Sequence, residues 1–166
     1  MKIKKFLLFT LSILLLALIF QSCSRKEFTT TLDCKELSKR LESEIHLPDG
    51  EFEEYSREEL AFLFPSAQLY DDICIIYSSD STDISELGII YSADEENAKK
   101  LFEEAKLYVK NMQEQKSEFL RNYSPDELSK LNSAEARRFG NYVIFAIGEQ
   151  EDKNNLFKKA EDMLSH

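Results

Sequence analysis

The sequence predicts an α+β domain with a mainly antiparallel sheet of about four strands, arranged as two hairpins and covered by helices. Two pairs of apolar, strand-length runs are each joined by a short polar connection, a pattern that favours hairpins. Between and after these pairs, apolar residues recur at spacings of three and four, which is typical of amphipathic helices. This domain follows an N-terminal segment with the pattern of a lipoprotein signal peptide.

That N-terminal segment has the features of an export signal. Lys2, Lys4 and Lys5 precede an apolar run from Phe6 to Phe20, and a basic start before a short apolar core is typical of secretory signals. The run has 15 residues, whereas a membrane-spanning helix needs roughly 20. We therefore expect a signal peptide over residues 1–22, with an uncleaved membrane anchor as the alternative.

Cys23 indicates which kind of signal this is. A cysteine directly after the apolar core, with the small Ser22 before it, resembles the bacterial lipobox, in which the thiol receives a diacylglyceryl group and the chain is cut before the cysteine. Phe20 and Gln21 depart from the commonest lipobox residues, so an ordinary secretory signal with a chance cysteine is the alternative. Two acyl chains suffice for lasting attachment, because each buried methylene contributes about 0.8 kcal/mol. The prediction is lipidation at Cys23 and a place on the extracytoplasmic face of the cell membrane.

Length and charge bound the rest of the chain. The 144 residues from Cys23 to His166 fit one domain, which we divide into a tether at 23–32 and a single domain at 33–166. The whole sequence carries a formal charge of −10, and removal of three lysines and no acids takes it to −13. Such an acidic surface repels nucleic acid and anionic headgroups. We therefore expect no nucleic-acid partner, and attachment to the membrane through the acyl chains on Cys23.

The first part of the domain predicts two short helices. Asp33 is a good N-cap for a helix whose apolar stripe consists of Cys34, Leu37, Leu41 and Ile45. A Pro-Asp-Gly turn at 48–50 ends this helix. Ser56 and Glu59 have capping-box spacing, and the helix that they begin ends before Pro65.

A first hairpin and a long helix follow. Residues 73–77 and 87–91 are apolar runs on either side of a polar loop at 78–83, which predicts antiparallel pairing. The helix begins near Ser92 or Asp94 and runs to about residue 122. Its middle, 111–116, is almost wholly polar, so we expect the helix either to overhang the body there or to bend.

The last part of the domain predicts a short helix, a second hairpin and a final helix. Ser124-Pro125-Asp126-Glu127 is a strong helix start, and the helix runs to about Leu131. Residues 134–139 and 142–147 then form a hairpin around Gly140-Asn141. The second of these strands is apolar throughout, which favours a central strand with cover on both faces. The final helix occupies 151–164.

Several of these segments together resemble a known family. They are the strand end Ile89-Ile90-Tyr91-Ser92-Ala93-Asp94, the helix with Gln115 and Ser117 near its end, Tyr123-Ser124-Pro125-Asp126-Glu127, and the strand from Gly140-Asn141-Tyr142-Val143 to Ile147. Over about residues 37–164 the chain resembles the small lipoproteins of Gram-positive, Firmicutes-type bacteria grouped as domain of unknown function 4358. The resemblance implies an exported, lipid-anchored α+β domain, and it supplies no activity and no catalytic residues.

The sequence itself predicts no catalytic, cofactor-binding or metal site. His46 and His166 are the only histidines, and neither has a partner at metal-ligand or triad spacing. Both are expected to be solvated or capping residues. The four glycines are not clustered into a phosphate loop, and no nucleophile elbow occurs.

Acidic pairs are the nearest approach to a ligand set. Asp71-Asp72 precedes the first strand, and Asp80 and Asp83 share the hairpin loop. A hard cation such as calcium requires several oxygen ligands, but this loop lacks EF-hand order, so a solvated turn is the preferred interpretation. The glutamate pairs at 95–96 and 103–104, with lysines nearby, predict a solvated helix face.

Two cysteines and four aromatic residues leave alternatives open. Cys34 and Cys74 can form a disulfide in an exported protein, or they are simply small buried residues. Aromatic side chains on one sheet face would make a binding platform for peptide or glycan, whereas core positions with hydroxyls at the edge are commoner. The four that fall on predicted strands are Tyr77, Tyr91, Tyr142 and Phe145.

These observations favour a lipid-anchored envelope protein that is not an enzyme and that binds or scaffolds an extracytoplasmic protein or glycan. A hydrolase of envelope polymers with carboxylates from distant segments is the main alternative, and a solute or cation receptor is another. A deep cleft lined by converging carboxylates would favour the hydrolase. An aromatic-bearing sheet face or an exposed apolar groove would favour partner binding.

Overall fold

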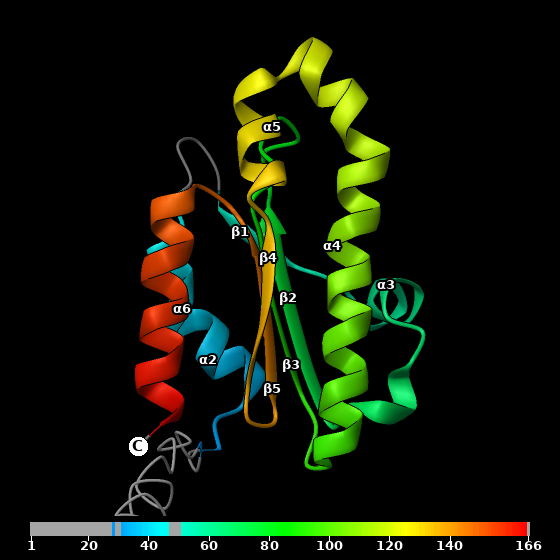
Figure 1. Ribbon diagram of the computed structural model, residues 1–166, viewed down its shortest axis with the longest axis vertical. Coiled ribbons are helices and arrows are strands. Elements are labelled where there is room, and N and C mark those ends of the chain that lie inside the picture. Colours follow the sequence, from blue (N-terminus) through cyan, green and yellow to red (C-terminus); the bar gives the residue numbers. More distant parts are fainter. Residues whose placement is uncertain (1–27, 29–30, 47–50, 166) are drawn as a thin grey trace, which may run out of the picture.

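The computed structural model describes residues 28, 31–46 and 51–165. The predicted signal peptide, Cys23 and most of the predicted tether lie outside these residues. Within them, a five-stranded antiparallel sheet lies between two layers of helices (Figure 1). The strands, in the spatial order β1-β2-β3-β5-β4, are β1 (Phe52–Glu54), β2 (Asp72–Ser78), β3 (Glu86–Tyr91), β4 (Glu135–Phe139) and β5 (Tyr142–Ile147).

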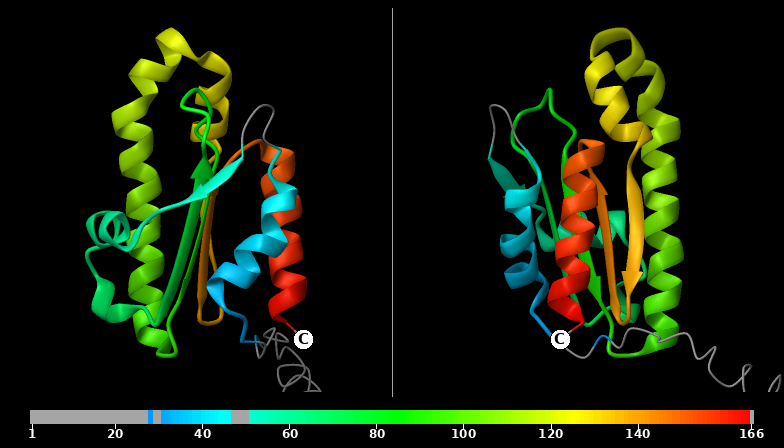
Figure 2. Two further views of the ribbon diagram at one scale, coloured as in Figure 1. Left: turned by 180° about the vertical axis from the view of Figure 1, so that it is seen from behind. Right: turned by 60° about the vertical axis from the view of Figure 1, so that its left-hand side comes forward.

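The helices divide between the two faces of the sheet, as both views in Figure 2 show. Helices α2 and α6 cover one face, and α4 with α3 covers the other, while α5 packs against the end of α4. The α+β class and the antiparallel sheet are thereby confirmed, with one more strand than expected. The helices are α2 (Cys34–Leu41), α3 (Arg57–Leu63), α4 (Glu95–Tyr123), α5 (Pro125–Asn132) and α6 (Gln150–Leu164), with short 3₁₀ turns at Glu42–Glu44 and Ala67–Leu69.

The additional strand, β1, lies at the sheet edge beside β2. Glu53 lies opposite Tyr77, whose hydroxyl donates to the Glu53 carboxylate at 3.1 Å. The Tyr55 ring lies 4.3 Å from the Tyr77 ring, centroid to centroid. Three residues, two of them glutamate, show no alternating apolar pattern, and this strand therefore depends on contacts with β2 that sequence spacing does not reveal.

The sheet is buried on both faces, which explains why its central strands β3 and β5 consist almost wholly of apolar residues. All six residues of β5 are buried, and so are the first five of β3. Alternate residues point to opposite layers: Leu87, Ile89 and Ile144 pack with α2 and α6, whereas Ile90 and Val143 pack with α4. The prediction of a central strand at 142–147 with cover on both sides is confirmed.

Gly88 in β3 shows how closely this second layer packs. A methyl group at Gly88 would lie 2.0 Å from Cε1 of Phe145, the residue paired with it on β5. Only a residue without a side chain leaves room for that ring. Gly140 has a different role, because its φ of 59° in the β4–β5 turn is a conformation that favours glycine.

Helix α4 is longer than the sheet and extends past its end. The carboxylate of Asp94 accepts the N–H of Asn97 at 2.8 Å and caps the first turn, so Asp94 is the cap of the two candidates, Ser92 and Asp94. The later part of α4 rises above the strands, and α5 returns beside it (Figure 1). In the polar middle of the helix, Met112 packs against a small cluster of Leu120, Leu131 and Ile147 that joins the two helices to the sheet.

Cys34 and Cys74 are both buried free thiols, so the interpretation as small core residues holds and no disulfide joins them. Burial raises the pKa of the Cys74 thiol to about 11, which keeps it protonated at neutral pH. No helix in the described part of the chain is both long and apolar enough to span a bilayer.

Candidate functional site

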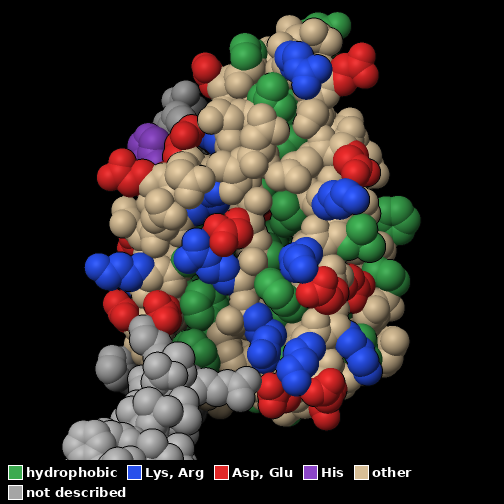
Figure 3. All heavy atoms as spheres, in the orientation of Figure 1, with side chains coloured by type: hydrophobic (Ala, Val, Ile, Leu, Met, Phe, Trp, Pro, Cys, Tyr) green, Lys and Arg blue, Asp and Glu red, His purple; other side chains and the backbone are tan. Residues whose placement is uncertain are grey.

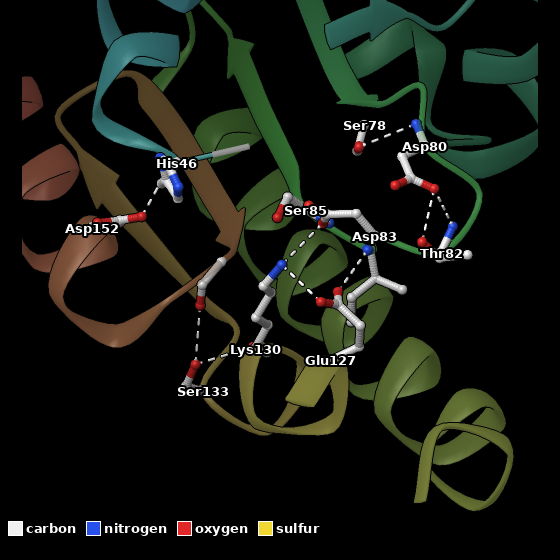
Figure 4. Close-up of polar contacts among 12 residues, drawn as sticks. His46, Ser78, Asp80, Thr82, Asp83, Ser85, Glu127, Lys130, Ser133 and Asp152 are labelled. Carbon is white, nitrogen blue, oxygen red and sulfur yellow. Dashed lines mark hydrogen bonds and ion pairs between the residues drawn. The ribbon is translucent and has the colours of Figure 1, made fainter. Parts of the chain in front are cut away.

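Of the residues singled out in the sequence, His46 is an exposed residue just after α2. Its backbone N–H donates to the carboxylate of Asp152 at 2.9 Å (Figure 4). The imidazole itself is solvated, as predicted. His166 lies outside the described residues.

The hairpin loop that carries Asp80 and Asp83 is closed by its own carboxylates. Asp80 accepts both the N–H and the hydroxyl of Thr82 at 2.8 Å, and Asp83 accepts the N–H of Ser85 at 2.7 Å (Figure 4). Asp80 therefore fits the predicted turn, whereas Asp83 is nearly buried rather than solvated. Among the described residues, no group of three or more His, Cys, Asp or Glu side chains is placed to hold a metal ion.

Asp83 is buried because Lys130 of α5 binds it. The Lys130 ammonium lies 3.2 Å from Asp83 and 2.8 Å from Glu127, and Glu127 also accepts the N–H of Ile84 at 2.9 Å (Figure 4). Burial opposes the charge of Lys130, but the two carboxylates outweigh it and raise its pKa. This buried triad fastens α5 to the β2–β3 loop, which is a structural role.

A second buried lysine, Lys153 of α6, donates from its ammonium to the backbone carbonyl of Ser133. Burial lowers the pKa of Lys153. The contact joins the start of α6 to the segment just before β4, so it too holds elements together.

Glu86 is the buried carboxyl of the sheet. It lies at the start of β3, is 3% exposed, and accepts the Tyr108 hydroxyl of α4 at 2.7 Å. Burial raises the pKa of Glu86 to about 7, although the Tyr108 hydrogen bond opposes this shift. Because the Glu86 carboxyl contacts α4 rather than solvent, we assign it to the core, as a residue with a raised pKa.

A candidate ligand site lies where β1 ends. The Tyr55 N–H donates to the Ile75 carbonyl at 3.0 Å, and the chain then leaves the sheet for α3. Ile73 pairs with Ile90 of β3 on one side, and no strand in the described part of the chain lies beside it on the other. The first three residues of β2, Asp72 to Cys74, therefore have no neighbouring strand on their outer side, and we call this part of the strand the lower half of β2.

A cleft of about 490 Å³ lies along this uncovered edge, between the start of α2 and the start of α3. We call it the edge cleft. Four carboxylates line it, from Asp33, Glu54, Asp71 and Asp72. Its other lining residues are the cations Lys35 and Arg57, the aromatic residues Tyr55 and Tyr70, and the apolar residues Leu60 and Ile73.

Each carboxylate of the edge cleft also has a structural partner. Asp33 caps α2 by accepting the N–H groups of residues 35 and 36 at 2.9 and 3.1 Å. Asp71 accepts the N–H of Ala93 at 2.7 Å, and Glu54 forms an ion pair with Lys35. Asp72 uses both oxygens, one for the N–H of Cys34 at 2.7 Å and one for that of Ile73 at 2.9 Å.

Charge and aromatic surface distinguish this cleft from a neutral hollow. Four carboxylates against two cations leave a formal charge of −2. Tyr55 also borders a neighbouring hollow of about 330 Å³ on α3, whose walls are largely apolar and include Phe62, 86% exposed. The two hollows share Tyr55 and form an acidic and aromatic surface at one sheet edge.

The opposite sheet edge differs in its charges. Figure 3 shows lysines and arginines interspersed with carboxylates on the face that carries α4 and β4. Arg137 of β4 bonds to Glu135 at 2.8 Å and lies over the Phe157 ring, and Arg138 donates to the Gly140 carbonyl at 2.7 Å. Side chains at that edge are held by neighbours in the same chain.

The sequence identified part of the edge cleft but not its function. The sequence analysis noted Asp71-Asp72 only as an acidic pair before the first strand, and in the structure both carboxylates bind backbone N–H groups. The single aromatic platform is wrong, because Tyr77 and Phe145 face the α3 and α4 layer whereas Tyr91 and Tyr142 face α2. The missed signal is the segment 51–59, which has five glutamates in nine residues.

Comparison with known proteins identifies the family to which the sequence belongs. The sequence model described as "Domain of unknown function (DUF4358)" matches residues 65–148, which is half of the chain. The chain belongs to this family. The match includes β2 to β5 with α4 and α5, and it leaves out α2, β1, α3 and α6. No curated protein and no solved structure gives a significant match.

The raised pKa of Glu86 predicts a specific pH dependence of stability. The pKa of a glutamate is ordinarily 4.5, and that of Glu86 in the folded protein is about 7. Between these two pH values the folded protein holds a proton that the unfolded chain has lost. Stability should therefore fall as pH rises through this window, by about 3 kcal/mol, and level off above it. Glu86→Gln keeps an acceptor for Tyr108 without a titrating proton, so we expect the difference in unfolding free energy between variant and wild type to grow across this window. Urea unfolding at several pH values measures it, and parallel curves would contradict the assignment.

Proposed function

We propose that the protein is a lipid-anchored cell-envelope lipoprotein that binds another extracytoplasmic component through the edge cleft and acts without catalysis. The anchor is inferred from the signal pattern and Cys23. The observation that carries the binding role is the uncovered half of β2 beside a cleft of charge −2. A strand edge with unpaired backbone groups is a ready template for another chain.

The contacts of the carboxylates favour binding over hydrolysis. A general acid and base must be able to exchange protons with a substrate. In the edge cleft, both oxygens of Asp72 accept backbone N–H groups, and Asp33 serves as a helix cap. The carboxyl with the raised pKa, Glu86, is 3% exposed. These contacts assign the carboxylates to shaping the cleft and setting its charge.

The position of the cleft along the chain fits a partner near the membrane. Asp33, a lining residue, directly follows the predicted tether 23–32. Ten extended residues reach about 35 Å. If Cys23 carries the acyl chains, the cleft stays within that distance of the bilayer surface, and its partner is a membrane protein or a component close to the membrane.

The anchor is tested by Cys23→Ala. We expect this variant to lose incorporation of labelled fatty acid and to leave the membrane fraction, because the thiol is the acceptor of the lipid. Ser24→Ala, which keeps the thiol, is the matched control and should behave as wild type. Equal membrane retention of Cys23→Ala and wild type, with no label in either, would contradict the anchor.

The binding role is tested by photo-crosslinking in cells. A photoreactive amino acid at Arg57, an exposed residue of the cleft, should give a discrete adduct whose partner is identified by mass spectrometry. The same amino acid at Glu118, exposed on the outer part of α4, should give no such adduct. The proposal fails if position 57 yields no discrete adduct, or if both positions give the same products.

A further inference from the structure

We infer that the partner of the edge cleft is an extended protein segment rich in lysine or arginine, which pairs as an extra strand with the lower half of β2. This inference rests on the proposed binding role and specifies its ligand. The alternatives, a cationic small molecule or an acidic polymer, are separated by the experiment below.

The backbone of β2 presents its hydrogen-bonding groups to the cleft at every second residue. Ser78 donates to the Ser85 carbonyl of the β2–β3 connection at 2.9 Å, so in an antiparallel ladder the residues in step with Ser78, including Cys74, face β3. The residues between them face outward. Ile75 does so, since its carbonyl accepts from Tyr55, and Ile73, two residues away, therefore faces the cleft.

Ile73 is ready to pair because its present contact is local. Its N–H donates to the carboxylate of the preceding residue, Asp72, at 2.9 Å. The pairing of β1 with β2 ends at Glu54 opposite Ile76, so β1 does not reach the carbonyl of Ile73. A side chain that covers an edge N–H is a common way to protect an open edge, and an incoming strand can replace it without disturbing the rest of the sheet.

An incoming strand would continue the line of β1. Strand β1 ends at Glu54, opposite Ile76, and the Tyr55 contact to Ile75 is its last hydrogen bond to β2. The open edge beyond that contact extends from Cys74 to Asp72, which leaves room for a short strand of about three residues at 3.3 Å each. So short a ladder needs added affinity from side chains, and these determine the partner's composition.

The side chains of the edge cleft favour positive charge on the partner. Asp33 uses one carboxylate oxygen to cap α2, and Asp71 uses one to accept the N–H of Ala93. The other oxygen of each is directed to neither contact and is open to a lysine or arginine. The Tyr55 and Tyr70 rings offer faces for the same cations and for their aliphatic stems.

The probe is a set of octapeptides in which Lys or Arg alternates with Val, Ile, Thr or Tyr, with a matched set in which Glu replaces each cation. Binding is measured by the fluorescence anisotropy of labelled peptides titrated with the full-length, detergent-solubilised protein. We expect members of the basic set to bind at least tenfold more tightly than their acidic counterparts, and the affinity to fall with added salt. Equal binding by the two sets would overturn the inference.

Backbone pairing is tested with N-methylated peptides. In a strand, every second N–H points to one neighbour, so methylation of one alternate set of nitrogens should reduce binding by at least tenfold, whereas methylation of the other set should change it little. If methylation of both sets reduced the affinity equally, or if neither reduced it, the peptide would be bound by its side chains alone, and strand addition would be overturned. Spermine, a cation without a peptide backbone, should bind far more weakly than the peptides.

The site is tested by removing charge without removing structure. Asn replaces Asp at helix caps with little loss, so Asp33→Asn with Asp71→Asn keeps the backbone contacts and should weaken the best basic peptide at least tenfold. Glu118→Gln with Glu151→Gln changes the net charge equally at exposed positions on α4 and α6 and is the matched control. Equal effects of the two pairs would contradict the site. If crosslinking from position 57 succeeds but no basic peptide binds, the binding role stands and this inference falls.

Discussion

Burial of one sheet on both faces determines how the other elements of this protein are arranged. Strands β3 and β5 have apolar residues pointing both ways, so neither face can meet water. One layer of helices, α2 and α6, and a second, α4 with α3, are both required. Polar groups able to meet a ligand are left to the ends and edges of the sheet.

Where a charge does enter this interior, a specific partner accompanies it. Glu86 has Tyr108, Lys130 has Asp83 and Glu127, and Lys153 has the Ser133 carbonyl. Each contact joins the sheet or its loops to a helix. Like catalytic groups, these side chains are titratable. Their burial and their partners, however, show that they connect the layers of the structure.

The length of β1 determines where the surface opens. A longer edge strand would have covered β2 to its end and closed the edge cleft. Instead β1 has three residues, and the chain crosses to α3 at Ser56, whose side chain and Glu59 form the capping box that begins the helix. A local helix signal thus ends the strand and leaves part of β2 uncovered, beside glutamates that make this edge acidic.

Local signals explain how much of this could be predicted from the sequence. The caps at Asp33, Ser56 and Asp94 and the apolar runs gave the helices, the central strands and the two-faced burial of β5. Strand β1 and the Lys130 triad could not be predicted, because they depend on pairs such as Glu53 with Tyr77 and Lys130 with Asp83, which are far apart in the chain. The edge cleft combines segments from residue 33 to residue 73, and no spacing rule brings them together.

Nuclear Overhauser effects between a bound basic octapeptide and the backbone of β2 would detect strand addition itself. Because Cys74 directs its N–H and carbonyl toward β3, its α proton points to the open edge. Strand addition predicts close contacts between peptide α protons and that of Cys74, with the Ile73 amide newly protected from exchange. Contacts confined to the side chains of Tyr70 and the carboxylates, with the backbone of β2 unchanged, would show that no strand is added.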